Sequence, residues 1–395
     1  MNDWLKIEEK HSSGAYGGWP MTIVKGSGAY LWDSNNKKYL DLATGIGVAS
    51  LGHSNDSIKK ALTDQSKKLI SASHGYYGND IRAQYLKKLS EISPKNLNRI
   101  FLCNSGTEAV EGAIKLARSY TKRPKIIACI RGYHGRTLGA LSATWKEAMK
   151  APFYPVVPDF EHVPFGKIDP IKNKLSNDVA AVLIEPIQGE GGVYPAPKEY
   201  LIELKKLCNK NKSLLLFDEV QCGFGRTGEW FASDYFGVEP DIISIAKAQG
   251  GGIPIGAVIS NDNIKFEKKM HGSTYGGNPL SCAVGISVIE YIMKNDILDN
   301  VKKMGKYFTQ ELNYLVDDYP SILKDVRGVG LMIALQFRGS AGPALMGLLD
   351  RGILALTAGK PNLRFLPPYI ISKKEIDHTI LSLKEILDEI SWKTS

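Results

Sequence analysis

Two residues whose side chains could act together, Lys247 and Asp218, each stand directly after a short apolar run. Lys247 follows residues 242–246, Ile-Ile-Ser-Ile-Ala, and Asp218 follows residues 214–217, Leu-Leu-Leu-Phe. If both runs are parallel strands, the amine and the carboxylate meet at one edge of a sheet. A lysine can hold an aldehyde as an imine, and a buried aspartate can keep the ring nitrogen of pyridoxal phosphate protonated. Pyridoxal phosphate chemistry requires such a pair, but neither residue is diagnostic alone. Lys247 also fits a solvated lysine, and Asp218 also fits a helix cap or one end of a metal site.

Two further segments follow apolar runs and could bind the phosphate group and the planar ring of such a cofactor. Residues 104–108, Asn-Ser-Gly-Thr-Glu, precede positions with helical spacing, and the free N–H groups at a helix start bind anions such as phosphate. Ser105 and Glu108 also satisfy a plain capping box, so this segment alone favours a structural role. Tyr133, in the Gly-Tyr-His-Gly-Arg-Thr segment at 132–137, could stack on a planar ring or simply pack.

These segments, taken together and in order, resemble signature segments of one protein family. Residues 244–256 around Lys247, 216–228 around Asp218 and 104–118 are similar to those of the class III aminotransferases, the ornithine and acetylornithine type. The resemblance spans essentially the whole chain and is greatest to the acetylornithine aminotransferases. The chain departs from the family at Val110 and Gly112, just after the phosphate turn, and at Gly18 in the N-terminal arm.

The resemblance implies a role for each matching residue, with pyridoxal 5'-phosphate as the cofactor. The spacing of the cysteines and histidines predicts no metal site. Lys247 would carry the cofactor and act as the base, and Asp218 would pair with the ring nitrogen. The other implied cofactor contacts are Ser105, Gly106, Thr107 and Thr274 to the phosphate, and Tyr133, Val220 and Gln221 to the ring and its oxygen.

The resemblance also implies how substrates bind. Arg364 would hold the α-carboxylate and Arg136 the remote carboxylate, because a guanidinium can bind a carboxylate at two points. Glu190 would pair with Arg364 while a terminal amine reacts and move away for 2-oxoglutarate; a plain loop glutamate is the alternative. Tyr16 would line the approach to the site, and Ser273 would come with Thr274 from the other subunit of a homodimer.

Short apolar runs alternate with helix-length segments between residues 51 and 285, which predicts an α/β fold with a mainly parallel sheet. The resemblance implies the aspartate aminotransferase-like arrangement, fold type I, with a smaller α+β domain. We expect an N-terminal arm at 1–50 that packs with the small domain, a large cofactor-binding domain at 51–285 and a small domain at 286–395.

Composition narrows the class of protein. The 395 residues are 43% hydrophobic and 23% charged, as in a soluble globular protein, and the N-terminus lacks a signal-peptide pattern, so a cytoplasmic location is expected. The five scattered cysteines include no Cys-x-x-Cys pair. A net charge of +9 raises the alternative of a nucleic-acid-binding protein, but the lysines are spread over the whole length without basic and aromatic clusters.

The expected activity is transfer of the terminal amino group of N2-acetyl-L-ornithine to 2-oxoglutarate, as in arginine biosynthesis, giving N-acetylglutamate 5-semialdehyde and glutamate. Ornithine, succinylornithine, N-succinyl-diaminopimelate and 4-aminobutyrate remain open as amine donors. An aminomutase or decarboxylase on the same framework is a further alternative, against which Arg136 and Glu190 argue, since they suit two alternating substrates.

Overall fold

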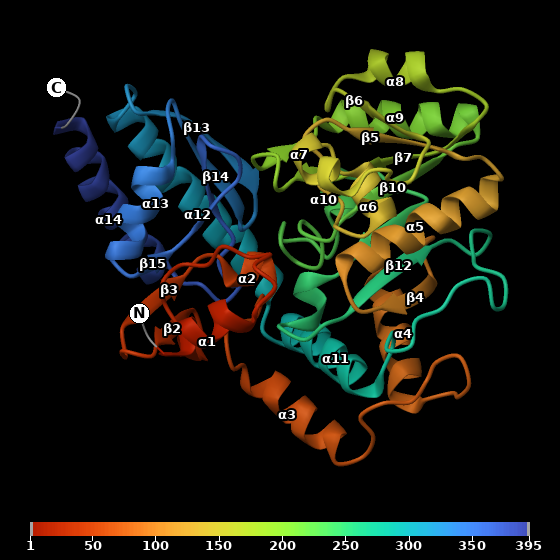
Figure 1. Ribbon diagram of the computed structural model, residues 1–395, viewed down its shortest axis with the longest axis horizontal. Coiled ribbons are helices and arrows are strands. Elements are labelled where there is room, and N and C mark those ends of the chain that lie inside the picture. Colours follow the sequence, from red (N-terminus) through yellow and green to blue (C-terminus); the bar gives the residue numbers. More distant parts are fainter. Residues whose placement is uncertain (1–2, 393–395) are drawn as a thin grey trace.

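The computed structural model describes residues 3–392, and a seven-stranded sheet forms its larger part (Figure 1). Strands β11, β10, β7, β5 and β6 pair in parallel, and β12 pairs antiparallel with both β11 and β4. The strands predicted from apolar runs are confirmed, whereas β6 and β12 were not predicted. In spatial order the strands are β4 (Arg99–Cys103), β12 (Gly256–Ser260), β11 (Ile242–Ile245), β10 (Leu214–Asp218), β7 (Val179–Ile184), β5 (Lys125–Cys129) and β6 (Phe160–Val163).

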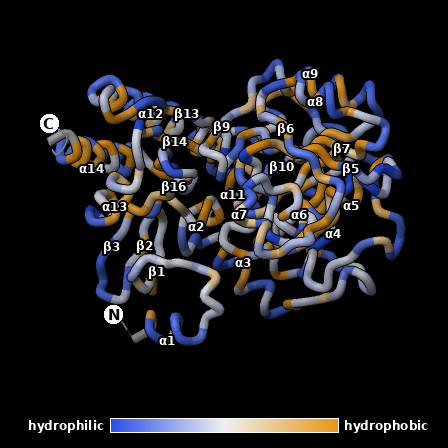
Figure 2. The backbone as a smooth tube through the Cα atoms, turned by 45° about the horizontal axis from the view of Figure 1, so that its top comes forward, coloured by the Kyte–Doolittle hydropathy of each residue, from blue (hydrophilic) through white to orange (hydrophobic). Residues whose placement is uncertain are grey.

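Helices cover both faces of this sheet, which explains why its strands read as continuous apolar runs. Alternate residues of β10 enter different cores: Leu216 packs with helix α5 (Gly106–Thr121), and Phe217 lies in the core that includes α9 (Lys198–Asn211). Figure 2 shows the apolar strands enclosed by more hydrophilic segments. Helix α11 (Pro279–Lys294) packs against α3 (Asp56–Ser66) and α4 (Asp80–Ile92).

A second sheet, with the strand order β13-β14-β17-β16, lies in the smaller part of the molecule (Figure 1). Its strands are β13 (Leu323–Val329), β14 (Met332–Phe337), β17 (Asn362–Phe365) and β16 (Leu356–Thr357), and its helices are α12 (Ile297–Asp318), α13 (Gly342–Asp350) and α14 (Lys373–Trp392). At the start of α14, the carboxylate of Glu375 accepts bonds from both the backbone N–H and the hydroxyl of Ser372. Helices α11 and α12 are separated at Asp296, whose φ of 49° is left-handed.

The N-terminal strands join this smaller part through a third sheet. Strands β1 (Ile23–Ser27), β2 (Tyr30–Asp33) and β3 (Lys38–Asp41) continue into β15 (Ile353–Leu354), which pairs in parallel with β3. This pairing supports our proposal that residues 1–50 pack with the small domain. The boundary at 285/286 falls inside α11, so we propose to place the division at the end of that helix, after Lys294.

The remaining elements are short or lie at the edges. They are α1 (Asp3–His11), α2 (Thr44–Gly47), α6 (Leu138–Ala143), α7 (Glu147–Lys150), η1 (Ala151–Phe153), α8 (Ile168–Lys174), β8 (Ile187–Gln188), β9 (Tyr194–Pro195), α10 (Ala232–Phe236) and η2 (Lys247–Gly250). Between residues 3 and 392, none of the helices combines the length and apolar character that a bilayer crossing needs.

Candidate active site

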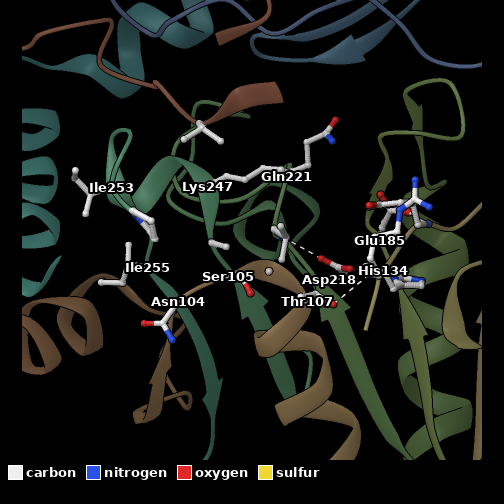
Figure 3. Close-up of a pocket in the computed structure, with 18 of the residues that line it drawn as sticks. Asn104, Ser105, Thr107, His134, Glu185, Asp218, Gln221, Lys247, Ile253 and Ile255 are labelled. Carbon is white, nitrogen blue, oxygen red and sulfur yellow. Dashed lines mark hydrogen bonds and ion pairs between the residues drawn. The ribbon is translucent and has the colours of Figure 1, made fainter. Parts of the chain in front are cut away.

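A cavity of about 430 Å³ lies at the carboxyl ends of β10 and β11, where both predicted chemical groups meet. Asp218 is the last residue of β10 and is in register with Ser244 of β11, three residues before Lys247. Figure 3 shows Lys247 and Gln221 at one side of the pocket and Ser105 at the beginning of α5 at the other. The predicted residues that line it are Ser105, Gly106, Thr107, Tyr133, Arg136, Asp218, Val220, Gln221 and Lys247.

Lys247 begins the short helix η2 directly after the buried strand β11. Its φ of 45° is left-handed, a costly conformation for a residue with a side chain, and such strain concentrates at functional sites. Burial lowers the pKa of the Lys247 amine, and the charges of Asp218 and Glu190 offset this in part. Both the position and the lowered pKa suit a lysine that must be deprotonated to react.

The carboxylate of Asp218 is 4% exposed and is held by a histidine. Its Oδ2 lies 2.8 Å from Nδ1 of His134, and its Oδ1 accepts a bond from the backbone N–H of Val220 at 3.1 Å. Burial lowers the pKa of His134, but the bond to Asp218 and its charge outweigh this, so the pKa is raised overall. The bond to His134 fixes the orientation of the Asp218 carboxylate, a group that can pair with a protonated ring nitrogen.

A second buried acid, Glu185, lies beside this pair. Its two carboxylate oxygens accept bonds from the backbone N–H groups of Tyr133 and Gly189. Burial raises the pKa of Glu185 to about 7, opposed by the charge of His134. Neither His134 nor Glu185 was predicted as a site residue. The signal that could have found His134 is its place in the same segment as Tyr133.

The beginning of helix α5 forms the opposite side of the pocket. Ser105 is its N-cap residue and accepts a bond from the N–H of Glu108, as the capping box predicts. Gly106 packs so closely on Val220 that an added Cβ would lie 2.6 Å from its Cγ1. The hydroxyl of Thr107 accepts bonds from the backbone of the next loop. A helix start with this close backbone approach suits a phosphate.

These groups together fit pyridoxal phosphate. The α5 start offers N–H groups for the phosphate, Asp218 offers a buried anion for the ring nitrogen, and Lys247 offers an amine for the aldehyde. Tyr133 is half-buried in the pocket wall, where its ring can cover a planar cofactor. Among the described residues, no cluster of three or more possible metal ligands lies anywhere in the chain.

The two arginines predicted to bind substrate lie in different environments. Arg364, on β17, is 2% exposed, and its Nη1 pairs with Oε1 of Glu190 at 2.6 Å and bonds to Oε1 of Gln221 at 3.2 Å. Glu190 lies in the hairpin formed by β8 and β9 (residues 187–195), which we name the Glu190 hairpin. Arg136 is exposed at the pocket, with its guanidinium carbon 5.9 Å from the ring centre of Tyr133.

Five predicted residues are not among those that line this pocket. Glu190 and Arg364 adjoin it through their bonds to Gln221, whereas the other three lie apart from it. Tyr16 is 96% exposed on the N-terminal arm. Ser273 and Thr274 line a separate hollow with His74, and Thr274 is exposed. The hydroxyl of Ser273 bonds to the side chain of Asn104, just before α5, and to the N–H of Gly276.

Comparison with known proteins identifies the family and the fold of the chain. The profile of the family Aminotransferase class-III matches residues 13–387. The chain is 42% identical to an acetylornithine aminotransferase from Methanocaldococcus jannaschii, with 98% of both chains covered. A crystal structure of the ornithine aminotransferase from Toxoplasma gondii superimposes with a TM-score of 0.94, at 30% identity over 99% of this chain and 96% of that one.

An acetylornithine aminotransferase from Elizabethkingia anophelis gives a TM-score of 0.85, at 31% identity over 98% of each chain. These similarities establish the aspartate aminotransferase-like fold that was expected and leave no support for the nucleic-acid-binding alternative. With a match over nearly all of its length, the chain belongs to the class-III aminotransferases, which depend on pyridoxal phosphate, and it is a transaminase.

Proposed function

We propose that this transaminase moves the terminal amino group of N2-acetyl-L-ornithine to 2-oxoglutarate, giving N-acetylglutamate 5-semialdehyde and glutamate. The archaeal relative described above carries the name acetylornithine aminotransferase, which supports this choice of donor. Ornithine, succinylornithine, N-succinyl-diaminopimelate and 4-aminobutyrate are the competing donors.

The observation that carries the proposal is the ion pair between Glu190 and Arg364. A terminal amine brings no carboxylate to the reacting end, so an unpaired Arg364 would be a buried charge without a partner. Glu190 supplies that partner and, being 34% exposed, has room to leave. When 2-oxoglutarate binds, its α-carboxylate takes the place of Glu190 on Arg364. The exposed Arg136 is available for the second carboxylate of either substrate.

The residues of the pocket divide the chemistry among them. Pyridoxal phosphate, when bound, supplies an aldehyde that takes up the amine and a ring that draws electrons from the substrate carbon. Lys247 moves the proton at that carbon, and the lowering of its pKa by burial favours this role as a base. Asp218, oriented by its bond to His134, would pair with the protonated ring nitrogen. Ser105, Gly106 and Thr107 would hold the phosphate, and Tyr133, Val220 and Gln221 would contact the ring.

We further propose a homodimer in which the loop at 271–276 completes the site of the partner. Thr274 is exposed and lies outside the pocket of its own chain, which fits a contact made across an interface. The exposed side chains of Leu69, Ile70, Tyr76 and Tyr77 provide apolar surface for such an interface. Tyr16 is proposed to approach a substrate only in the assembled enzyme. A cytoplasmic location fits the five free, buried cysteines.

Single-turnover absorbance spectra of the cofactor, recorded with a panel of the five donors, test the substrate. We expect acetylornithine to react with the highest kcat/KM, and a competing donor that exceeds it would replace it in the proposal. Arg136→Ala should lower kcat/KM for both acetylornithine and 2-oxoglutarate by about 1 to 2 kcal/mol, because Arg136 is exposed before substrate binds. An uncharged primary amine is the control, and an equal loss toward it would make Arg136 structural.

A further inference from the structure

Arg327 connects the two parts of the molecule that carry the Glu190–Arg364 pair. It lies on β13 and is 11% exposed. Its Nε donates to the carbonyl of Gly192 in the Glu190 hairpin at 3.0 Å. Its Nη2 donates to Oδ1 of Asn362 at 2.5 Å, and Asn362 is two residues before Arg364 on β17. A single guanidinium therefore spans from the hairpin to the strand.

The small-domain sheet places both arginines on one face. Arg327 is in register with Ala334 of β14, and Ala334 is in register with Arg364 of β17. Residues that pair directly across strands point to the same side of a sheet. Gln336, on the same face, accepts a further bond from Arg327 at 2.7 Å.

The Glu190 hairpin is held against this face by its backbone. A Cβ at Gly192 would lie 2.8 Å from Nδ2 of Asn362 and 3.5 Å from Nη2 of Arg327. At Gly189 it would lie 2.3 Å from Oε1 of Gln221. The guanidinium of Arg327 also stacks over the ring of Tyr194, 4.1 Å from its centre. The hairpin therefore has little freedom apart from the side chain of Glu190.

We infer that Arg327 is a positioning residue that holds Glu190 against Arg364 and so biases the pocket toward amine donors that lack a carboxylate at the reacting end. The inference rests on the proposed exchange of Glu190 for an α-carboxylate. Without Arg327, no guanidinium bonds to both the Glu190 hairpin and β17. Glu190 is then held less firmly in the position where it pairs with Arg364. Arg364 is then more available to a substrate carboxylate.

The test is a selectivity ratio, defined as kcat/KM for acetylornithine divided by kcat/KM for glutamate, whose α-carboxylate lies at the reacting end. Glu190→Ala should lower this ratio because it frees Arg364. Arg327→Met should lower it by about fivefold or more, within the range of couplings found inside one hydrogen-bonded network. In the Glu190→Ala background, Arg327→Met should change the ratio by less than about twofold, because it acts through Glu190.

Binding of glutarate to the holoenzyme, measured by calorimetry, gives a readout that does not depend on turnover. Arg327→Met should bind this dicarboxylate more tightly than the wild type. If Arg327 acted only by attracting the negative charges of glutarate, its loss would weaken glutarate binding instead. Arg338→Met is the matched control, since Arg338 is exposed on the small domain and bonds to the carbonyl of Pro320. Its ratio and glutarate affinity should equal those of the wild type.

Arg327→Lys is the second variant, for use if Arg327→Met does not fold. A single ammonium cannot reproduce the planar fork that reaches both Gly192 and Asn362, so the ratio should again fall. If Glu190→Ala leaves the ratio unchanged, the exchange at Arg364 is refuted and the role of Arg327 falls with it. If Glu190→Ala lowers the ratio but neither Arg327 variant does, or if glutarate binds more weakly, the role of Arg327 alone is overturned.

Discussion

Replacing Asp218 with asparagine tests the central electrostatic arrangement of the pocket. The carboxylate accepts from His134 at 2.8 Å through one oxygen, and the other oxygen faces the backbone N–H of Val220. Asparagine keeps the shape but has a single acceptor oxygen, so its NH₂ group would face one of the two donors, either His134 or the backbone N–H of Val220. The variant cannot hold a protonated ring nitrogen with a full negative charge.

The magnitude follows from the burial of the pair. Asp218 is 4% exposed, so water cannot replace the lost charge. Removing one charge-assisted contact in a dry site costs about 3 kcal/mol or more of transition-state stabilisation, which is about a hundredfold in kcat/KM. The free energy of unfolding should fall by about 1.5 to 3 kcal/mol because the bond to His134 is weakened.

Steady-state kinetics with acetylornithine and 2-oxoglutarate, together with urea unfolding, measure both effects. Asp262→Asn is the matched control, because Asp262 is an exposed acid paired with Arg99 at 2.6 Å. Its kcat/KM should be unchanged, and its free energy of unfolding should stay within about 0.5 kcal/mol of the wild type. If Asp218→Asn keeps the kcat/KM of the wild type, the carboxylate does not control the ring nitrogen and the reasoning fails.

Three further outcomes are expected. The Lys247→Ala variant should still bind the cofactor, as measured by absorbance after gel filtration, but should lose multiple turnover. If turnover is retained, Lys247 is not the residue that carries the cofactor and acts as the base. Gly106→Ala should weaken cofactor binding in a fluorescence titration by about 1 to 3 kcal/mol, because its Cβ would lie 2.6 Å from Cγ1 of Val220, and an unchanged Kd would contradict the close approach. Because the pKa of His134 is raised in the folded protein, protonation of His134 stabilises the fold. This contribution is fully present at pH values below the ordinary pKa of 6.5 and is lost as the pH rises through the folded-state pKa. The loss of unfolding free energy in His134→Gln should therefore be larger at about pH 6 than at about pH 9, and a pH-independent loss would show that His134 is not charged.

The positions of Lys247 and Asp218 could be predicted from local sequence, because strands buried on both faces read as unbroken apolar runs. The bond between His134 and Asp218 could not, since it joins residues 84 positions apart and leaves no local periodicity. The strand β12 was also not predicted. Its antiparallel direction depends on long-range pairing with β4 and β11, which leaves no local pattern.

Other parts of the site depended on family resemblance and not on pattern. Nothing near Glu190 or Arg364 indicates that they meet, although the structure pairs them at 2.6 Å. The break between α11 and α12 at Asp296 leaves no mark in the hydrophobic pattern either, because apolar positions continue through both helices.

The pairing of β3 with β15 has a consequence for how the chain reaches this structure during synthesis. The N-terminal strands leave the ribosome long before their last partner, and contacts such as that between Lys37 and the carbonyl of Asp350 close a span of 313 residues. Such distant contacts form late because the entropy of closing the span must be overcome first. The nascent N-terminal segment therefore waits as an open sheet edge while the large domain is made, a period in which it is exposed to aggregation and to chaperones.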